Sequence, residues 1–186
     1  MNYKIVSGVI EGHIFSDCWM HSENYGSNFI VHSLNGWFGS LINVAIDITN
    51  ENIGYALVYK IVVPDTIYLF RTTDKFENVN VINKFNFPNG IIIQLSSGNL
   101  EGALFLYNQY TNYLSFSSDY AENFELIDYF NFKDQYYFDI TGGRQTGEIY
   151  ILYSFVNMLW QNAHVYVYHS LDYGKTFEVF HPFAKG

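Results

Sequence analysis

The sequence predicts an all-β protein built from a repeated unit. An eight-residue pattern starts at positions 22, 72, 117 and 170, in steps of 50, 45 and 53 residues, and a recurring unit of this length indicates a repeat architecture. Short runs rich in Tyr, Phe, Val and Ile alternate with Gly, Asn and Asp, as strands and turns do. No segment keeps the 3.6-residue period of an amphipathic helix, and aromatic residues make up 20% of the chain, which favours strands.

The last copy of the pattern is the most complete. Residues 170–177 read Ser-Leu-Asp-Tyr-Gly-Lys-Thr-Phe, and the copies at 22–29, 72–79 and 117–124 keep only part of this pattern. Asn fills the Thr position in the three weaker copies. The residues that carry the motif are Ser22, Asn24, Gly26 and Phe29; Thr72 and Asp74; Ser117, Asp119 and Phe124; and Ser170, Asp172, Gly174, Thr176 and Phe177.

These residue types suit a tight hairpin turn. Ser and Asp side chains hydrogen-bond to nearby backbone amides, Gly tolerates a positive φ, and the closing aromatic ring is expected to pack against a neighbouring sheet. Phe76 and Ala121 stand where Gly26 and Gly174 stand in the other copies. We therefore expect distortion or strain in those two turns.

A second repeat has the same period. Residues 45–49 and 137–141 match in residue type, and 92–96 lies between the other two motif copies. Each is followed by a Gly-containing loop and then an apolar run, at 54–59, 102–107 and 147–153. The Tyr and Val content of 149–160 predicts a strand there and not a short helix.

The eight-residue pattern resembles the Asp-box, or bacterial neuraminidase repeat (BNR). The resemblance implies a β-propeller of the sialidase and sortilin type, in which the box joins the third and fourth strands of each four-stranded blade. Xyloglucan-cleaving glycosidases and photosystem assembly factors look similar at these positions. Residues 169–185 also look like repeat regions of secreted surface proteins of the Bacteroidetes type.

This comparison allows the strands to be counted. The spacing leaves room for about 15 strands, one short of four complete blades, in a single β-propeller domain spanning 1–186. The chain is expected to be either a small closed ring with an incomplete blade or, the interpretation we favour, an excerpt of a larger propeller. An excerpt would expose raw sheet edges and an apolar flank, which further blades of the same or another chain would cover.

Charge and composition exclude several function classes. The net charge is −9 and no basic run is present, which argues against nucleic-acid and anionic-membrane partners. The sequence has no 18-residue apolar run, so membrane insertion is not expected, and residues 1–20 lack a signal-peptide pattern. No cofactor or metal is expected, because no phosphate-binding Gly-rich loop and no His pair with ligand spacing occur. Cys18 is the single cysteine, so it cannot form an intrachain disulfide.

Enzymatic residues are sparse. Sialidases hold their substrate carboxylate with three arginines, whereas this chain has only Arg71 and Arg144, which makes sialidase activity unlikely on this resemblance. Asp47 and Asp139 are the natural candidates for a glycosidase carboxylate pair, because both are expected on inner strands facing the channel. Both belong to the repeat and are therefore expected to be structural, and related enzymes carry their active site on the opposite face.

The expected ligand-binding residues lie in the loops of that opposite face, at 33–40, 86–90, 131–135 and 157–164, and in a further loop that holds Tyr110 and Asn112. Exposed aromatic side chains beside amides suit sugar stacking or peptide docking, and the alternative is that the tryptophans fold back over the core. The candidate residues are Trp37, Tyr110, Trp160 and Asn162.

The sequence thus favours a non-catalytic binding or scaffold module of a secreted or cell-surface bacterial protein, with a carbohydrate or protein ligand. The alternative is a glycoside hydrolase-like enzyme or its accessory domain.

Overall fold

The computed structural model describes residues 5–7, 10–11, 13–16, 20–31, 39–60, 66–86, 93–108, 113–129, 135–156 and 163–180. Sixteen strands fall in these ranges and form four separate four-stranded sheets, which we call blades 1 to 4. In each blade the strands are hydrogen-bonded in sequence order, and neighbouring strands are antiparallel.

The strands of blade 1 have two or three residues, whereas those of the other blades are longer except for the three-residue β16. The predicted all-β class and the four-stranded units are confirmed, and the predicted strand over the start of 149–160 is β14. One strand more than the expected number is present, because the residues up to the first motif hold three short strands and not two. Blade 1 contains β1 (Ile5–Ser7), β2 (Ile14–Ser16), β3 (Met20–Ser22) and β4 (Ile30–Val31); blade 2 contains β5 (Gly39–Ile46), β6 (Gly54–Lys60), β7 (Thr66–Thr72) and β8 (Asn80–Asn86); blade 3 contains β9 (Ile93–Ser97), β10 (Leu104–Asn108), β11 (Tyr113–Ser117) and β12 (Glu125–Tyr129); blade 4 contains β13 (Gln135–Gly142), β14 (Ile149–Val156), β15 (Ala163–Ser170) and β16 (Glu178–Phe180).

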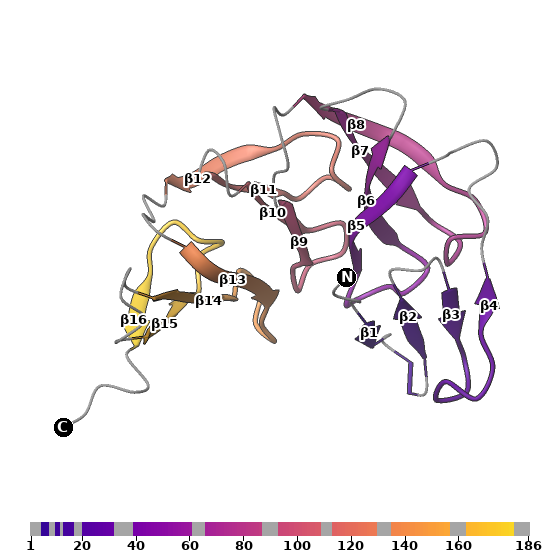
Figure 1. The fold of residues 1–186 in the computed structure, drawn as a ribbon, viewed down its shortest axis with the longest axis horizontal. Helices are drawn as coiled ribbons and strands as arrows, with labels where there is room; N and C mark the ends of the chain where they lie inside the picture. Colours follow the sequence, from indigo (N-terminus) through magenta and orange to yellow (C-terminus); the bar gives the residue numbers. More distant parts are fainter. Residues whose placement is uncertain are drawn as a thin grey trace.

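The blades follow one another along an arc, with the first strand of each blade on the inside (Figure 1). These inner strands contact each other in turn, β1 with β5, β5 with β9 and β9 with β13. The described strands of blades 1 and 4 lie apart in Figure 1. The four blades therefore form an open arc and not the small closed ring that the sequence allowed.

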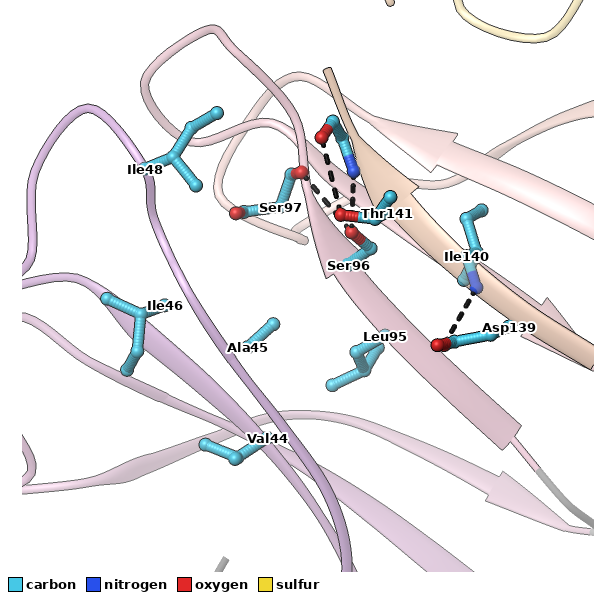
Figure 2. Close-up of a pocket in the computed structure, with 11 residues that line it drawn as sticks. Val44, Ala45, Ile46, Ile48, Leu95, Ser96, Ser97, Asp139, Ile140 and Thr141 are labelled. Carbon is cyan, nitrogen blue, oxygen red and sulfur yellow. Dashed lines mark hydrogen bonds between the residues drawn. The ribbon is translucent and has the colours of Figure 1, made fainter. Parts of the chain in front are cut away.

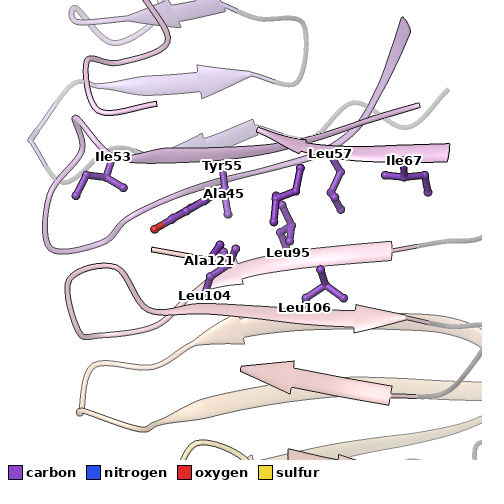
Figure 3. Packing of buried hydrophobic residues seen from close by; sticks show 10 residues of the cluster. Ala45, Ile53, Tyr55, Leu57, Ile67, Leu95, Leu104, Leu106 and Ala121 are labelled. Atoms are coloured by element: carbon purple, nitrogen blue, oxygen red, sulfur yellow. The ribbon is translucent and has the colours of Figure 1, made fainter. Parts of the chain in front are cut away.

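Buried apolar side chains fill the space between consecutive blades. Figure 3 shows the cluster between blades 2 and 3, where Tyr55 and Leu57 of β6 lie opposite Leu95 and Leu104. Successive side chains of a strand point to opposite faces, so Leu104 packs toward blade 2 while Phe105 packs toward blade 4. Burying one such side chain contributes about 1.5–3 kcal/mol to the free energy of unfolding. The other two clusters join Phe15 to Val44, Val58 and Phe70 between blades 1 and 2, and Phe105, Tyr107 and Leu114 to Phe138, Ile149 and Ile151 between blades 3 and 4.

The four motif copies form the hairpin turns between the third and fourth strands of the blades, and we call them the motif turns. In each turn the Ser or Thr oxygen at the first position accepts the backbone N–H four residues later, at 2.8–3.0 Å. The Asp or Asn Oδ1 at the third position likewise accepts the N–H four residues later, at 2.8–3.0 Å. The first hydroxyl also donates to this Oδ1. The same three bonds hold every turn, even where Asn24 replaces Asp and Thr72 replaces Ser.

The fifth motif position has a positive φ in all four turns, at 80° for Gly26, 67° for Phe76, 66° for Ala121 and 84° for Gly174. We expected distortion at Phe76 and Ala121, but both turns keep all three hydrogen bonds. The expected strain is present in the backbone angle, since a residue with a Cβ in this region costs on the order of 1–3 kcal/mol. The side-chain bonds therefore hold the turn shape against an unfavourable residue.

Polar contacts also cross from blade to blade on the face that carries the motif turns. Ion pairs of this exposed kind are individually weak, but they fix the register of one turn against the next. Lys75 Nζ lies 2.8 Å from Glu23 Oε1 of blade 1, Arg71 Nη1 lies 2.9 Å from Glu122 Oε1 of blade 3, and the Gly102 N–H of blade 3 donates to Asp47 Oδ2 of blade 2 at 2.7 Å.

Candidate functional site

A cavity of about 250 Å³ lies against the inner strands β5, β9 and β13 (Figure 2). Its walls combine aliphatic side chains with hydroxyl groups and one carboxylate. The lining residues are Val44, Ala45, Ile46 and Ile48 of blade 2, Leu95, Ser96 and Ser97 of blade 3, and Asp139, Ile140, Thr141 and Gly142 of blade 4.

The polar side of the cavity is held by contacts between β9 and β13. The Gly142 N–H donates to Ser96 Oγ at 2.9 Å, and the Gln94 side-chain amide donates to the carbonyl of Phe138. A Cβ at Gly142 would come within 2.2 Å of the Ser97 carbonyl oxygen. Glycine is therefore required here, because the two inner strands approach each other at this point.

The two predicted carboxylates have different roles. Asp139 lies on β13 in the cavity wall, is exposed, and accepts the Ile140 N–H through Oδ1 at 3.0 Å (Figure 2). Asp47 follows β5, is fully buried, and accepts the Thr49 N–H and hydroxyl as well as the Gly102 N–H. The expectation that both face the channel is wrong for Asp47, because its carboxylate caps a loop and links two blades.

A second hollow of about 520 Å³ adjoins the first and shares Ile48 and Gly142 with it. The loop between β13 and β14 forms most of its wall, and the exposed Arg144 lies on this loop. The loops after the inner strands contact the motif turns directly, since Tyr173 N–H donates to the Gly147 carbonyl at 2.8 Å, with equivalent bonds in blades 2 and 3. The second hollow therefore lies at the face of the motif turns, and the first adjoins it.

The carboxylate of Glu148 organises this second hollow. Its Oε2 accepts the N–H groups of Arg144 and Gln145 at 2.7 and 2.9 Å. Its Oε1 accepts the Tyr150 hydroxyl at 2.7 Å and lies 3.1 Å from His169 Nε2. The His169 ring also stacks on Tyr150, with centroids 4.6 Å apart.

These donors stabilise the ionised form of Glu148. The Gln145 N–H and the Tyr150 hydroxyl, together with His169, lower the pKa of its carboxyl to about 2 from a usual value of 4.5. The same bond raises the pKa of Tyr150. Glu148 is thus a permanent anion with its acceptor sites occupied, and it cannot supply a proton as a general acid near neutral pH.

Sequence reasoning missed this cluster. The sequence patterns single out neither His169 nor Glu148. A signal was available, because Glu148 occupies the position of Ile53 in blade 2 and Ala103 in blade 3, as shown by the shared backbone bond of the preceding loop. A charged residue where two repeats carry apolar ones indicates a local function.

The other predicted residues fall in different places. Arg71 lies on β7 and pairs with Glu122, whereas Arg144 lies in the loop between β13 and β14. The four ligand-binding candidates, Trp37, Tyr110, Trp160 and Asn162, lie outside the described residues. Within the described ranges, no group of three His, Cys, Asp or Glu side chains is placed to hold a metal ion. Nor does this part of the chain contain a helix that is long and apolar enough to cross a membrane.

No protein-family model and no curated protein sequence matches this chain. Solved structures do match. The GH74 enzyme of Niastella koreensis is 18% identical with a TM-score of 0.62, over 96% of this chain and 29% of that one. The GH74 xyloglucanase of Xanthomonas campestris is 12% identical with a TM-score of 0.58, over 94% and 29%.

YCF48 bound to the D1 peptide matches with 12% identity and a TM-score of 0.50, over 98% of this chain and 73% of that one. The fold is that of a β-propeller. At these identities the likeness shows the fold alone, and the β-propeller chain described here spans less than a third of each GH74 protein.

Proposed function

We propose that this β-propeller is a non-catalytic binding module whose ligand lies in the two adjoining hollows at the inner strands. The observation that carries the proposal is the state of the carboxylates there. Glu148 is saturated with donors and Asp47 is buried in a loop cap, which leaves Asp139 on the wall of the first hollow. Glycoside hydrolysis needs two carboxyl groups, one of them a proton donor.

The chemistry of the walls suits a ligand with alternating polar and apolar groups. Asp139 and the hydroxyls of Ser96 and Thr141 supply acceptors and donors, Ile48 supplies an apolar surface, and Arg144 supplies a cation beside them. An extended peptide segment or an oligosaccharide has this character. A structural likeness to a peptide-bound protein supports the first ligand class, and likeness to a xyloglucanase supports the second.

We also propose a family type for the motif turns and a location for the protein. We assign the motif turns to the Asp-box type of the sialidase and sortilin-like propellers, supported by the three side-chain bonds that recur in all four turns. The corresponding localisation is the cell surface or the secreted fraction of a bacterium. Fractionation of the source cells tests it, and recovery of the protein in the cytosol alone contradicts it.

Calorimetric titration tests the binding function with two panels, xyloglucan oligosaccharides and unstructured peptides. We expect saturable binding to one panel, weakened at least about 10-fold by Asp139→Asn or Arg144→Gln, because each removes a hydrogen bond to a charged group worth about 1.5 kcal/mol or more. Glu77→Gln and Lys84→Gln, at exposed positions of blade 2, are the matched controls and should bind as the wild type does.

The alternative function is a glycoside-acting enzyme that uses Asp139. It requires release of reducing sugar from xyloglucan, abolished by Asp139→Asn at an unchanged melting temperature. That result would replace the binding proposal. Absence of binding to both panels would instead leave a structural scaffold as the function.

A further inference from the structure

The outward face of blade 4 repeats the surface that the earlier blades use to pack on the next blade. The second residue of the second strand is Phe15, Tyr55 and Phe105 in blades 1 to 3, each no more than 1% exposed against the following blade. Its counterpart in blade 4 is Tyr150, paired in register with His169 just before the motif turn, and it is 37% exposed. Leu152, two residues further along β14, is equally exposed.

Blade 1 presents the matching surface at the other end of the arc. The closing aromatic residues of the third and fourth motif turns, Phe124 and Phe177, pack into the clusters shared with the preceding blade. Phe29 closes the first motif turn and is 43% exposed. The expectation that this ring buries against a neighbouring sheet is therefore not met at Phe29, because no described blade precedes blade 1.

The rims of these two surfaces are also complementary. At the junction of blades 1 and 2, the second motif residue of one blade, Glu23, pairs with the fourth motif residue of the next, Lys75. At a junction from blade 4 to blade 1, the corresponding residues are Leu171 and Tyr25. Both are exposed, by 55% and 70%. The junction thus replaces an ion pair by two apolar side chains.

We propose that blade 4 of one copy of this chain packs on blade 1 of a second copy, continuing the blade-to-blade interface of the arc. Such a head-to-tail contact repeats until the ring closes. Propeller rings contain about four to eight blades, and two four-bladed copies make a ring within this range whereas three do not. The assembly is a homodimer, with Leu152 and Leu171 of each copy buried against the other.

Light scattering after size-exclusion chromatography tests this assembly. We expect the wild type to have about twice the 21.6 kDa mass of the chain, and Leu152→Asp to reduce it to one chain with an unchanged far-UV circular dichroism spectrum. Leu126→Asp is the matched control, because Leu126 is 59% exposed on the outer strand of the interior blade 3 and should leave the dimer intact. A wild type that is monomeric up to its solubility limit overturns the proposal, as does a Leu152→Asp variant that stays dimeric.

A charge exchange tests the head-to-tail pairing. Leu171→Glu alone should weaken the dimer, since it places an unpaired carboxylate in the junction. Adding Tyr25→Lys places an ion pair across the junction of blade 4 and blade 1, equivalent to that of Glu23 with Lys75. The dimer should then bind more tightly again by up to about fivefold, less so in high salt. A double variant that is no tighter than Leu171→Glu overturns the pairing of blade 4 with blade 1.

Discussion

Glu148 shows how one residue sets the local chemistry of the site. Its carboxylate contacts two backbone N–H groups, the Tyr150 hydroxyl and the His169 ring at hydrogen-bond distance. This arrangement fixes the loop that carries Arg144 and orients Tyr150 on the outward face of blade 4. The residue is therefore a structural anion, and its low pKa has a consequence for stability in acid.

Replacing Glu148 by Gln tests this role. Because the folded-state pKa is lowered to about 2, the contribution of the carboxylate is fully present above the unfolded value near 4.5 and is lost as the pH falls toward 2. The melting temperature of Glu148→Gln should thus lie below that of the wild type at pH 7, and the gap should narrow between pH 4.5 and 2. Calorimetric scans across this range measure it, and a gap that is independent of pH contradicts the assignment.

Tyr150→Phe provides the graded control. It removes one of the donors that lower the Glu148 pKa, while the backbone N–H bonds remain. The acid-induced loss of stability should therefore begin near the same pH as in the wild type, end at a higher pH and be smaller in total. An unchanged acid profile would show that the phenol bond does not contribute.

At the scale of the elements, one residue of the motif turn and one residue of the second strand fill the same space in each blade. The fifth motif residue lies over the first residue of the second strand, and in three blades a large strand residue accompanies a small turn residue: Ile14 with Gly26, Leu104 with Ala121 and Ile149 with Gly174. In blade 2 the sizes are reversed, because the strand residue is the small Gly54 and the turn residue is the large Phe76. A Cβ at Gly54 would come within 2.5 Å of the Phe76 ring.

The double variant Gly54→Ile/Phe76→Gly copies the combination of blade 4 and tests this exchange. Gly54→Ile alone should cost about 1–3 kcal/mol through overpacking. Phe76→Gly alone should cost about 3–5 kcal/mol through the cavity it leaves, reduced by the roughly 1–3 kcal/mol of backbone strain that glycine relieves at this positive φ. In urea unfolding, the free energy lost by the double variant should be smaller than the sum of the two single losses by at least about 1 kcal/mol.

A remote pair provides the control for this cycle. Gly54→Ile combined with Ile151→Val in blade 4 should be additive to about 0.5 kcal/mol, because Ile151 belongs to a different cluster. If the losses from Gly54→Ile and Phe76→Gly also added to within about 0.5 kcal/mol, the two side chains would not compete for one space.

At the scale of the whole molecule, each blade is stabilised by its immediate neighbours. The three buried clusters join only consecutive blades, so stability approximates a sum of blade and interface contributions. Blades 2 and 3 have an interface on both faces, whereas blades 1 and 4 have one within the described chain. Unfolding should therefore begin at the ends of the arc.

Amide hydrogen exchange of the Leu152→Asp variant, in which association is removed, tests this order. The amides of Leu57 and Leu106 in the interior blades should exchange slowest, and those of Phe15 and Val167 in the end blades faster, because partial opening exposes the ends first. Mass spectrometry of proteolytic fragments gives the rates. Uniform protection of all four blades would indicate a single cooperative unit instead.

The sequence predicted those parts of the fold that depend on local interactions. The motif turns follow from Ser or Thr and Asp or Asn side chains that bond within the same eight residues, and β14 follows from its Tyr and Val content. The burial of Asp47 was not predictable in this way, because its partner Gly102 is 55 residues away in the next blade. The open arc also depends on how blades pack in space, which no spacing between motifs determines.

The candidate site was predicted less well than the fold. Asp139 was identified and lies in the cavity wall, but the cavity depends on the approach of β9 and β13 at Gly142. Three of the Glu148 partners, Arg144, Gln145 and Tyr150, lie within four residues of it. His169 comes beside Glu148 only when β14 and β15 pair. Expectations for the opposite face remain predictions.

The motif turns also bear on how such a chain diversifies. Their side-chain bonds need an oxygen acceptor at the first and third positions, and their backbone has a positive φ at the fourth and fifth. The second position takes no part in these requirements, as Glu23 and Leu171 illustrate, and the fourth accommodates both Tyr25 and Lys75. A lineage of these proteins could therefore alter its assembly partners by point changes at the rim while every hairpin keeps its geometry.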